Sequence, residues 1–167
     1  MFDRSSLLWT KLHPPSVRGD QITRPRLIAE LEDGLRGKLT LVSAQAGYGK
    51  TTLLADWTAR RHFRVAWVSL DPGDNTLERF LAHVIHALQA VYPGLGEATL
   101  AMLQARELPL DDLLISLAND LAAGLERAGV LSEPALLVLD DYHHIDDTAI
   151  HRAVTFLLDH APARFHL

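Results

Sequence analysis

The chain has 167 residues, of which 48% are hydrophobic and 22% are charged. That length suits one domain with a sizeable apolar core, and the composition is that of a folded globular protein, which excludes disorder as the main state. The 21 acidic and 16 basic side chains give a formal net charge of -5. Because no cluster of Lys and Arg stands out, these residues are not expected to wrap a nucleic-acid backbone.

The sequence has no cysteine, which excludes a disulfide framework and a thiolate metal site and suits a reducing compartment. The longest apolar run, Ala135 to Leu139, is far shorter than the roughly 20 residues that cross a bilayer. The first residues do not lead into the apolar stretch of a secretory signal peptide, so we take Met1 as the native start. We therefore expect a cytoplasmic protein that does not contact membranes.

Residues 1–20 contain two prolines and scattered charges without a sustained hydrophobic period. This pattern predicts an irregular N-terminal arm. The apolar residues Leu7, Leu8 and Trp9 are expected to pin the arm to the rest of the molecule.

Residues 21–167 are predicted to form a domain of alternating helices and strands. Its first helix is expected to have Thr23 as its cap and to end at Gly37. Short apolar, β-branched runs predict buried strands over 39–42, 65–68 and 135–139, and residues 165–167 look like the start of another strand. Apolar residues at helical spacing predict helices over about 51–61, 76–91, 97–105, 111–128 and 148–161, the second of them capped by Asn75.

The run 135–139 is apolar at every position, which is typical of a strand in a parallel sheet that is covered on both faces by helices. The predicted fold class is therefore α/β, with three layers and a parallel sheet.

A glycine-bearing loop over residues 44–52 lies between a predicted strand and a predicted helix. This context favours a phosphate-binding loop of the Walker A type. Gly47 and Gly49 let successive backbone N–H groups converge on an anion at the positive end of the helix. The predicted nucleotide-binding residues of this loop are Ala46, Gly47, Tyr48, Gly49, Lys50, Thr51 and Thr52.

Three side chains of this loop have separate predicted roles. Lys50 supplies a cation for the β and γ phosphates, and the Thr51 hydroxyl can reach a magnesium ion. Thr52 is expected to support the α phosphate. The motif usually opens with glycine, but Ala44 stands at that position, so the loop must begin without a left-handed residue there.

Asp140 and Asp141 follow the predicted strand 135–139, in the manner of a Walker B strand. Asp140 is the predicted magnesium ligand. Asp141 is expected to orient or deprotonate the water that attacks the γ phosphate, which makes it the predicted catalytic residue. Helix capping or simple solvation is the alternative interpretation of Asp141. The carboxyl ends of parallel strands share one edge of a sheet, so these acids and the loop are expected to meet.

Several segments together resemble the nucleotide-binding part of the MalT-like, LuxR-type large ATP-binding transcriptional regulators, which belong to the STAND class of signal-transduction ATPases. The resemblance covers nearly the whole chain, in order, and alanine at position 44 is usual in that family. The segments that carry it are Thr10–Leu12, Arg24–Leu27, Lys38–Thr52, Ala66–Asp71 with Asp74 and Asn75, and Leu139–His143.

The resemblance implies a nucleotide switch that binds ATP or ADP with Mg²⁺. ADP would hold the protein closed, whereas ATP and an inducer would open it for self-association and activation of transcription. Weak ATP hydrolysis is expected in the full-length protein, and DNA would be bound only through a domain absent from this chain. The resemblance also implies that Arg24 contacts the adenine. A further strand, beginning at about Phe165, would insert between the Walker A and Walker B strands, so the domain would be partial, truncated before this sensor strand.

Two other functions remain open at this stage, a small-molecule kinase and a nucleotide-dependent scaffold that does not hydrolyse ATP. A metal cluster of His143, His144 and His151 with Asp146 and Asp147 is disfavoured, because His143 belongs to the Walker B pattern of the resemblance and a solvated loop after the strand explains the other residues. The leucine stripe over 113–125 could bind a partner helix, but packing against the core is favoured.

Overall fold

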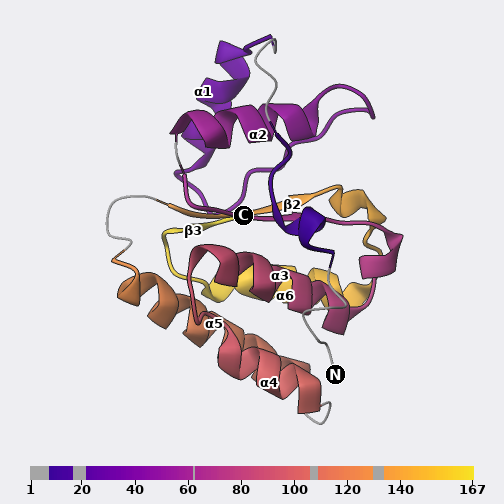
Figure 1. The fold of residues 1–167 in the computed structure, drawn as a ribbon, viewed down its shortest axis with the longest axis vertical. Helices are drawn as coiled ribbons and strands as arrows, with labels where there is room; N and C mark the ends of the chain where they lie inside the picture. The colour runs from indigo at the N-terminus through magenta and orange to yellow at the C-terminus, as the bar shows by residue number, and fades with distance from the viewer. Residues whose placement is uncertain (1–7, 17–21, 62, 106–108, 130–133) are drawn as a thin grey trace.

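The computed structural model of the chain describes residues 8–16, 22–61, 63–105, 109–129 and 134–167 (Figure 1). Three parallel strands form a sheet in the order β1-β2-β3. The strands are β1 (Val65–Ser69), β2 (Ala135–Asp140) and β3 (Phe165–His166). In their register Val65 lies opposite Leu136, and Ala135 lies opposite Phe165. The predicted parallel sheet is confirmed.

Helices cover both faces of this sheet (Figure 1). On one face lie α1 (Pro25–Gly34) and α2 (Lys50–Arg61), and on the other lie α3 (Leu77–Val91) and α6 (Thr148–His160). Outside α3 and α6 lie α4 (Glu97–Ala105) and α5 (Leu110–Arg127). Short 3-10 helices cover Trp9–Leu12 (η2), Pro72–Asp74 (η3) and Tyr142–His144 (η4). The α/β layers are therefore as predicted, with α4 and α5 as an additional outer pair. None of the described helices combines the length and apolar composition that a bilayer crossing needs.

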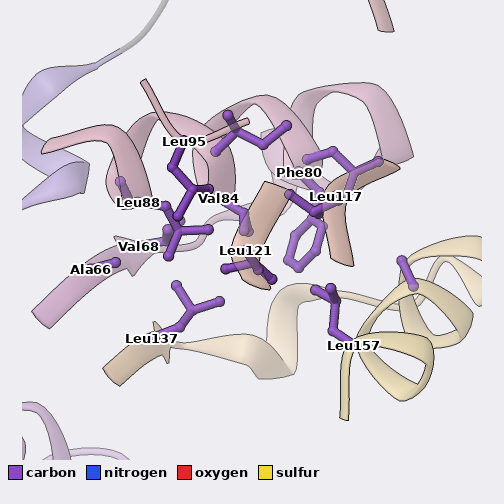
Figure 2. Close-up of a cluster of buried hydrophobic side chains, with 14 of the residues drawn as sticks. Ala66, Val68, Phe80, Val84, Leu88, Leu95, Leu117, Leu121, Leu137 and Leu157 are labelled. Carbon is purple, nitrogen blue, oxygen red and sulfur yellow. The ribbon is translucent and has the colours of Figure 1, made fainter. Parts of the chain in front are cut away.

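The larger part of the core lies between the sheet and the helices α3 to α6 (Figure 2). Phe80 and Val84 of α3 lie here with Leu137 of β2, all of them buried. The leucine stripe of α5 belongs to the same cluster, which confirms that it packs against the core. A smaller cluster on the opposite face of the sheet contains Leu31 of α1, Trp57 of α2 and Leu136.

The predicted strand over residues 39–42 is wrong. Only its beginning is paired: the Leu167 N–H donates to the Lys38 carbonyl and the Thr40 N–H donates to the Leu167 carbonyl, both at 2.9 Å. Beyond Thr40 no backbone partner lies beside the segment among the described residues, and Leu41 is 82% exposed. A strand is defined by its neighbours, so an apolar run without them does not become one.

The end of the chain does lie between the two predicted strands of the site. β3 pairs with β2 on one side, while Leu167 bonds to Lys38 and Thr40 on the other. β3 thus lies between β2 and the segment 38–40, on the side of β2 where the family resemblance places this strand.

His166 strengthens this junction through both ring nitrogens. Its Nδ1 lies 2.9 Å from the Gly37 carbonyl, and its Nε2 lies 2.9 Å from the Thr40 hydroxyl. Since a carbonyl only accepts, Nδ1 carries the proton and Nε2 accepts from Thr40. A Cβ on Gly34 would come within 2.3 Å of the Thr40 Oγ1, so glycine leaves the space that the hydroxyl occupies.

A buried ion pair anchors the N-terminal arm together with Leu12, which is buried in the larger core cluster. Leu8 and Trp9 are exposed, which corrects the prediction for them, and Leu7 lies outside the described residues. The Lys11 Nζ lies 2.6 Å from carboxylate oxygens of both Asp71 and Asp74, and Asp74 is fully buried. The hydrogen bond from Lys11 lowers the pKa of Asp71.

Two predicted helix caps are also wrong. The N-cap of α1 is Arg24 and that of α3 is Thr76, and neither side chain makes a capping hydrogen bond. The Thr23 hydroxyl instead accepts a bond of 2.9 Å from Arg60. The Asn75 side chain bonds to residues that follow β2. In both cases a tertiary partner has displaced the local cap.

Replacing Lys11 with Met should destabilise the protein strongly, because the buried Asp74 carboxylate would lose its closest cation. Arg79, whose Nε lies 3.3 Å from the other Asp74 oxygen, would compensate the charge only in part. We therefore expect the free energy of unfolding to fall by about 3 kcal/mol in urea titrations, the lower end of the range for breaking a buried pair from one side. Arg26→Met removes an exposed pair with Glu30 and serves as the control, with an expected change below about 0.5 kcal/mol. Similar small losses in both variants would contradict the prediction.

Candidate functional site

The glycine loop, residues 44–49, connects the segment beside Leu167 to the start of α2. Gly47 and Gly49 have φ angles of 81° and 77°, in the left-handed region that glycine adopts without strain. A Cβ on Gly47 would meet nothing within 4 Å, so glycine is needed there for its conformation and not for space. The loop leads directly into α2, which begins at Lys50.

Two cationic side chains bond to the carbonyls of this loop. The Lys50 Nζ donates to the Ala44 carbonyl at 2.9 Å and to the Gln45 carbonyl at 3.3 Å. The Arg24 guanidinium donates to the Tyr48 carbonyl at 2.9 Å. Arg24, the residue directly before α1, therefore also contacts the loop. The Tyr48 side chain is exposed.

A hydrogen bond joins the glycine loop to the acidic end of β2. The Thr51 hydroxyl, in the first turn of α2, donates to the Asp140 Oδ1 at 2.9 Å. Asp140 is buried, and burial raises the pKa of its carboxyl, as does the neighbouring charge of Asp141. The hydrogen bond from Thr51 opposes this rise in pKa. The predicted meeting of loop and acids is thus observed for this pair.

Asp141 has a left-handed backbone with φ of 56°, among the described residues the one non-glycine position with positive φ. Asp is one of the few residue types that tolerate this conformation, which turns the chain sharply at the end of β2. The Asp141 N–H donates to the Asp140 Oδ1 at 3.2 Å, and the His143 Nδ1 lies 3.7 Å from an oxygen of the Asp141 carboxylate. The Asp141 side chain makes no capping bond to η4, so the alternative interpretation as a cap gains no support.

A cavity of about 950 Å³ extends from the glycine loop and the segment 39–43 along β2, from Leu136 to its carboxyl end, and also reaches α1, α2 and β3. Most of the predicted site residues line it together: Ala46, Gly47, Gly49, Lys50, Thr51, Thr52, Asp140 and Asp141. Arg24 and Tyr48 meet at the loop without lining the cavity. His143, which belongs to the Walker B pattern of the resemblance but was not among the predicted site residues, also lines it.

The histidines near β2 do not gather into a metal centre. Within the described ranges no group of three or more His, Asp or Glu side chains is arranged to hold a metal ion. His151 instead has its Nδ1 2.7 Å from the Tyr142 hydroxyl, a contact between η4 and α6. Burial raises the pKa of Tyr142, so this phenol stays neutral.

The fold and this site define a domain of a known family. Residues 35–165 match the family model described as an AAA domain, and the chain belongs to that family. The HTH-type transcriptional regulator MalT of Cronobacter sakazakii is 38% identical over 157 residues. The match covers 93% of this chain and 16% of that protein, so the chain spans about a sixth of the relative's length. The resemblance to MalT-like regulators that the sequence predicts is confirmed.

Asp140→Asn should stabilise the protein in the absence of any ligand. Because burial raises the pKa of Asp140, the ionised carboxylate lowers stability, and stability falls as pH rises through that pKa. The amide removes the charge and keeps an oxygen for Thr51. We expect a melting temperature about 3 °C higher at pH 7.

The gain should shrink on acidification, because the parent carboxyl is then protonated as well. Asp159→Asn, at an exposed position of α6, is the control and should leave the melting temperature unchanged. A gain that is equal at pH 7 and pH 4 would refute the assignment of the effect to the charge of Asp140.

Proposed function

We propose that this chain is a nucleotide-binding domain that binds ATP or ADP with Mg²⁺ and acts as a regulatory switch in a cytoplasmic transcriptional regulator. The observation that carries the proposal is the contact of Thr51 with Asp140, beside Lys50 and a loop with two left-handed glycines. One cavity thus combines backbone N–H groups, a cation and a carboxylate, the groups that a magnesium-bound triphosphate requires.

The residues at Thr51 and Asp140 fit a magnesium ion. Mg²⁺ prefers oxygen ligands and keeps several of its waters, so one hydroxyl and one carboxylate are a sufficient protein contribution. The bound ion would neutralise charge on the phosphates. Thr51 and Asp140 would hold it, and the loop residues 46–52 would hold the phosphates.

Arg24 is proposed to contact the adenine. Its guanidinium already lies on the glycine loop, bonded to the Tyr48 carbonyl. A base that is attached to phosphates in this loop would lie within reach of the guanidinium face. The N-terminal arm, residues 1–20, is proposed to be distinct from the domain of residues 21–167.

Asp141 is proposed as the catalytic residue of slow ATP hydrolysis in the full-length protein. Its carboxylate lines the cavity and is partly exposed, so it can accept a hydrogen bond from water. The water oxygen would attack the γ phosphorus as the bond to the β-phosphate oxygen breaks, and Asp141 would orient the water and accept its proton. The products are ADP and phosphate.

The regulatory role of the proposal comes from the relative. The printed name of that protein describes an HTH-type transcriptional regulator, and such a helix-turn-helix would bind DNA from another part of the full-length chain. Exchange of ADP for ATP would then control self-association of the protein.

Lys50→Ala should abolish nucleotide binding, because the phosphates would lose their principal cation and keep only the backbone N–H groups. Charge-assisted hydrogen bonds of this kind are worth several kcal/mol together, so we expect the affinity for Mg-ATP to fall at least about 100-fold in calorimetry. Arg36→Ala removes an exposed cation paired with Asp33 and should bind like the parent. An unchanged affinity of the Lys50 variant would remove the phosphate role from Lys50.

Asp141→Asn should leave ATP bound and slow its hydrolysis, since the amide cannot accept the proton of the attacking water. In single-turnover assays of the full-length protein we expect at least about a tenfold lower rate. The dissociation constant of Mg-ATP should stay within about twofold, because Asp141 is not proposed to hold the ion. Hydrolysis at the parent rate would reassign Asp141 to a structural role, and Asp159→Asn again provides the matched control.

A further inference from the structure

Asn75 joins two parts of the chain that are 71 positions apart in sequence. Its Oδ1 accepts hydrogen bonds of 3.0 Å from the backbone N–H groups of Asp146 and Asp147. Its Nδ2 donates to the carboxylate of Asp146. One side-chain amide therefore uses both acceptor lone pairs and a donor on the same short segment. α3 does not depend on this side chain, because its N-cap is Thr76.

The position of Asn75 is itself fixed by buried charge. It directly follows η3, whose two ends are joined by reciprocal hydrogen bonds. The Gly73 N–H donates to the carboxylate of the N-cap Asp71 at 2.8 Å, and the Asp71 N–H donates to the Asp74 carboxylate at 3.0 Å. The fully buried Asp74 is also held by Lys11 at 2.6 Å. Asn75 therefore extends from a rigid turn at the end of β1.

The segment that Asn75 holds is the far end of the acidic loop, residues 141–147. The near end is fixed by β2 and by the bond between Thr51 and Asp140. At the far end Asp147 caps α6, with its carboxylate accepting from the Ala149 N–H at 2.7 Å. Asp141 lies at the start of this loop in a left-handed conformation, which persists only where the surroundings fix it.

We infer that Asn75 is a positioning residue of the site: by fixing the far end of the acidic loop, it holds the Asp141 carboxylate in place for ATP hydrolysis. This inference rests on the proposed function. Asn75 does not line the cavity, so it acts through the loop and not on the nucleotide. An amide is required at position 75. An Asp side chain there would be repelled by the Asp146 carboxylate, and an Ala side chain would leave the N–H groups of Asp146 and Asp147 without their acceptor.

The first test compares Asn75→Ala with Asn119→Ala, the same change at an exposed position of α5. Mg-ATP affinity and single-turnover hydrolysis are measured in the full-length protein. We expect the rate constant to fall at least about tenfold in the Asn75 variant, because small displacements of a catalytic group have large effects on rate. The dissociation constant should change less than about twofold, and the Asn119 variant should match the parent in both quantities.

The second test exchanges the two side chains. Asn75→Asp alone places two carboxylates together and should slow hydrolysis as much as Asn75→Ala does. In the double variant Asn75→Asp, Asp146→Asn, the new carboxylate accepts from both N–H groups and from the new amide. We expect the hydrolysis rate to recover to within about threefold of the parent.

Each other outcome overturns the inference. A parent-like rate in both single variants would show that Asn75 does not position the loop, and a parallel loss of affinity and rate that the double variant does not restore would show a merely structural role. If the Ala variant does not fold, the Asp variant and the double variant decide between these outcomes. Binding of ATP without hydrolysis by the parent protein would overturn this inference and the catalytic role of Asp141, and would leave the proposed nucleotide binding in place. Failure of the parent protein to bind ATP would instead remove the proposed function.

Discussion

The hydrogen bond between Thr51 and Asp140 joins the start of α2 to the carboxyl end of β2. Parallel strands place their carboxyl ends at one edge of a sheet, and the glycine loop enters α2 at that edge. The bond keeps a hydroxyl and a buried carboxylate within one short distance, and the cavity, the position of Lys50 and the sharp turn at Asp141 are arranged around it. Burial disfavours the charged form of Asp140, and the hydrogen bond from Thr51 offsets part of that cost.

Elements that depend on local pattern were predictable from the sequence, whereas elements that depend on distant partners were not. β2 and α6 follow from an apolar run and from helical spacing, and both form within a residue or two of the predicted limits. The run 39–42 has the same local character as a buried strand, yet pairing is a property of two segments, and only Lys38 and Thr40 have a partner in Leu167. The glycine loop was identifiable because its φ angles demand glycine itself.

The contacts of Asn75 and Lys11 were likewise not predictable from the sequence, because their partners lie far away along the chain. Asn before a helix has the pattern of a cap, but the N–H groups of Asp146 and Asp147 compete for its oxygen, and no local rule describes that competition. The sequence pattern favours the apolar neighbours of Lys11 as anchors of the arm, because a lysine is rarely buried unless it is paired. Its partners Asp71 and Asp74 follow some 60 positions later. These residues lie in the segments that carry the family resemblance outside the loop, and together they connect the N-terminal arm to the acidic loop.

The two carbonyl contacts of Lys50 have a thermodynamic consequence for any anion that enters the cavity. A free lysine side chain loses up to about 2 kcal/mol of rotamer entropy when it is immobilised. Lys50 has lost much of that freedom already, since Ala44 and Gln45 hold its ammonium group above the loop. An ammonium group has three N–H donors, so one of them is left for an incoming oxygen. The attraction between this cation and an anion is therefore opposed by little further ordering, so the glycine loop is preorganised for anion binding.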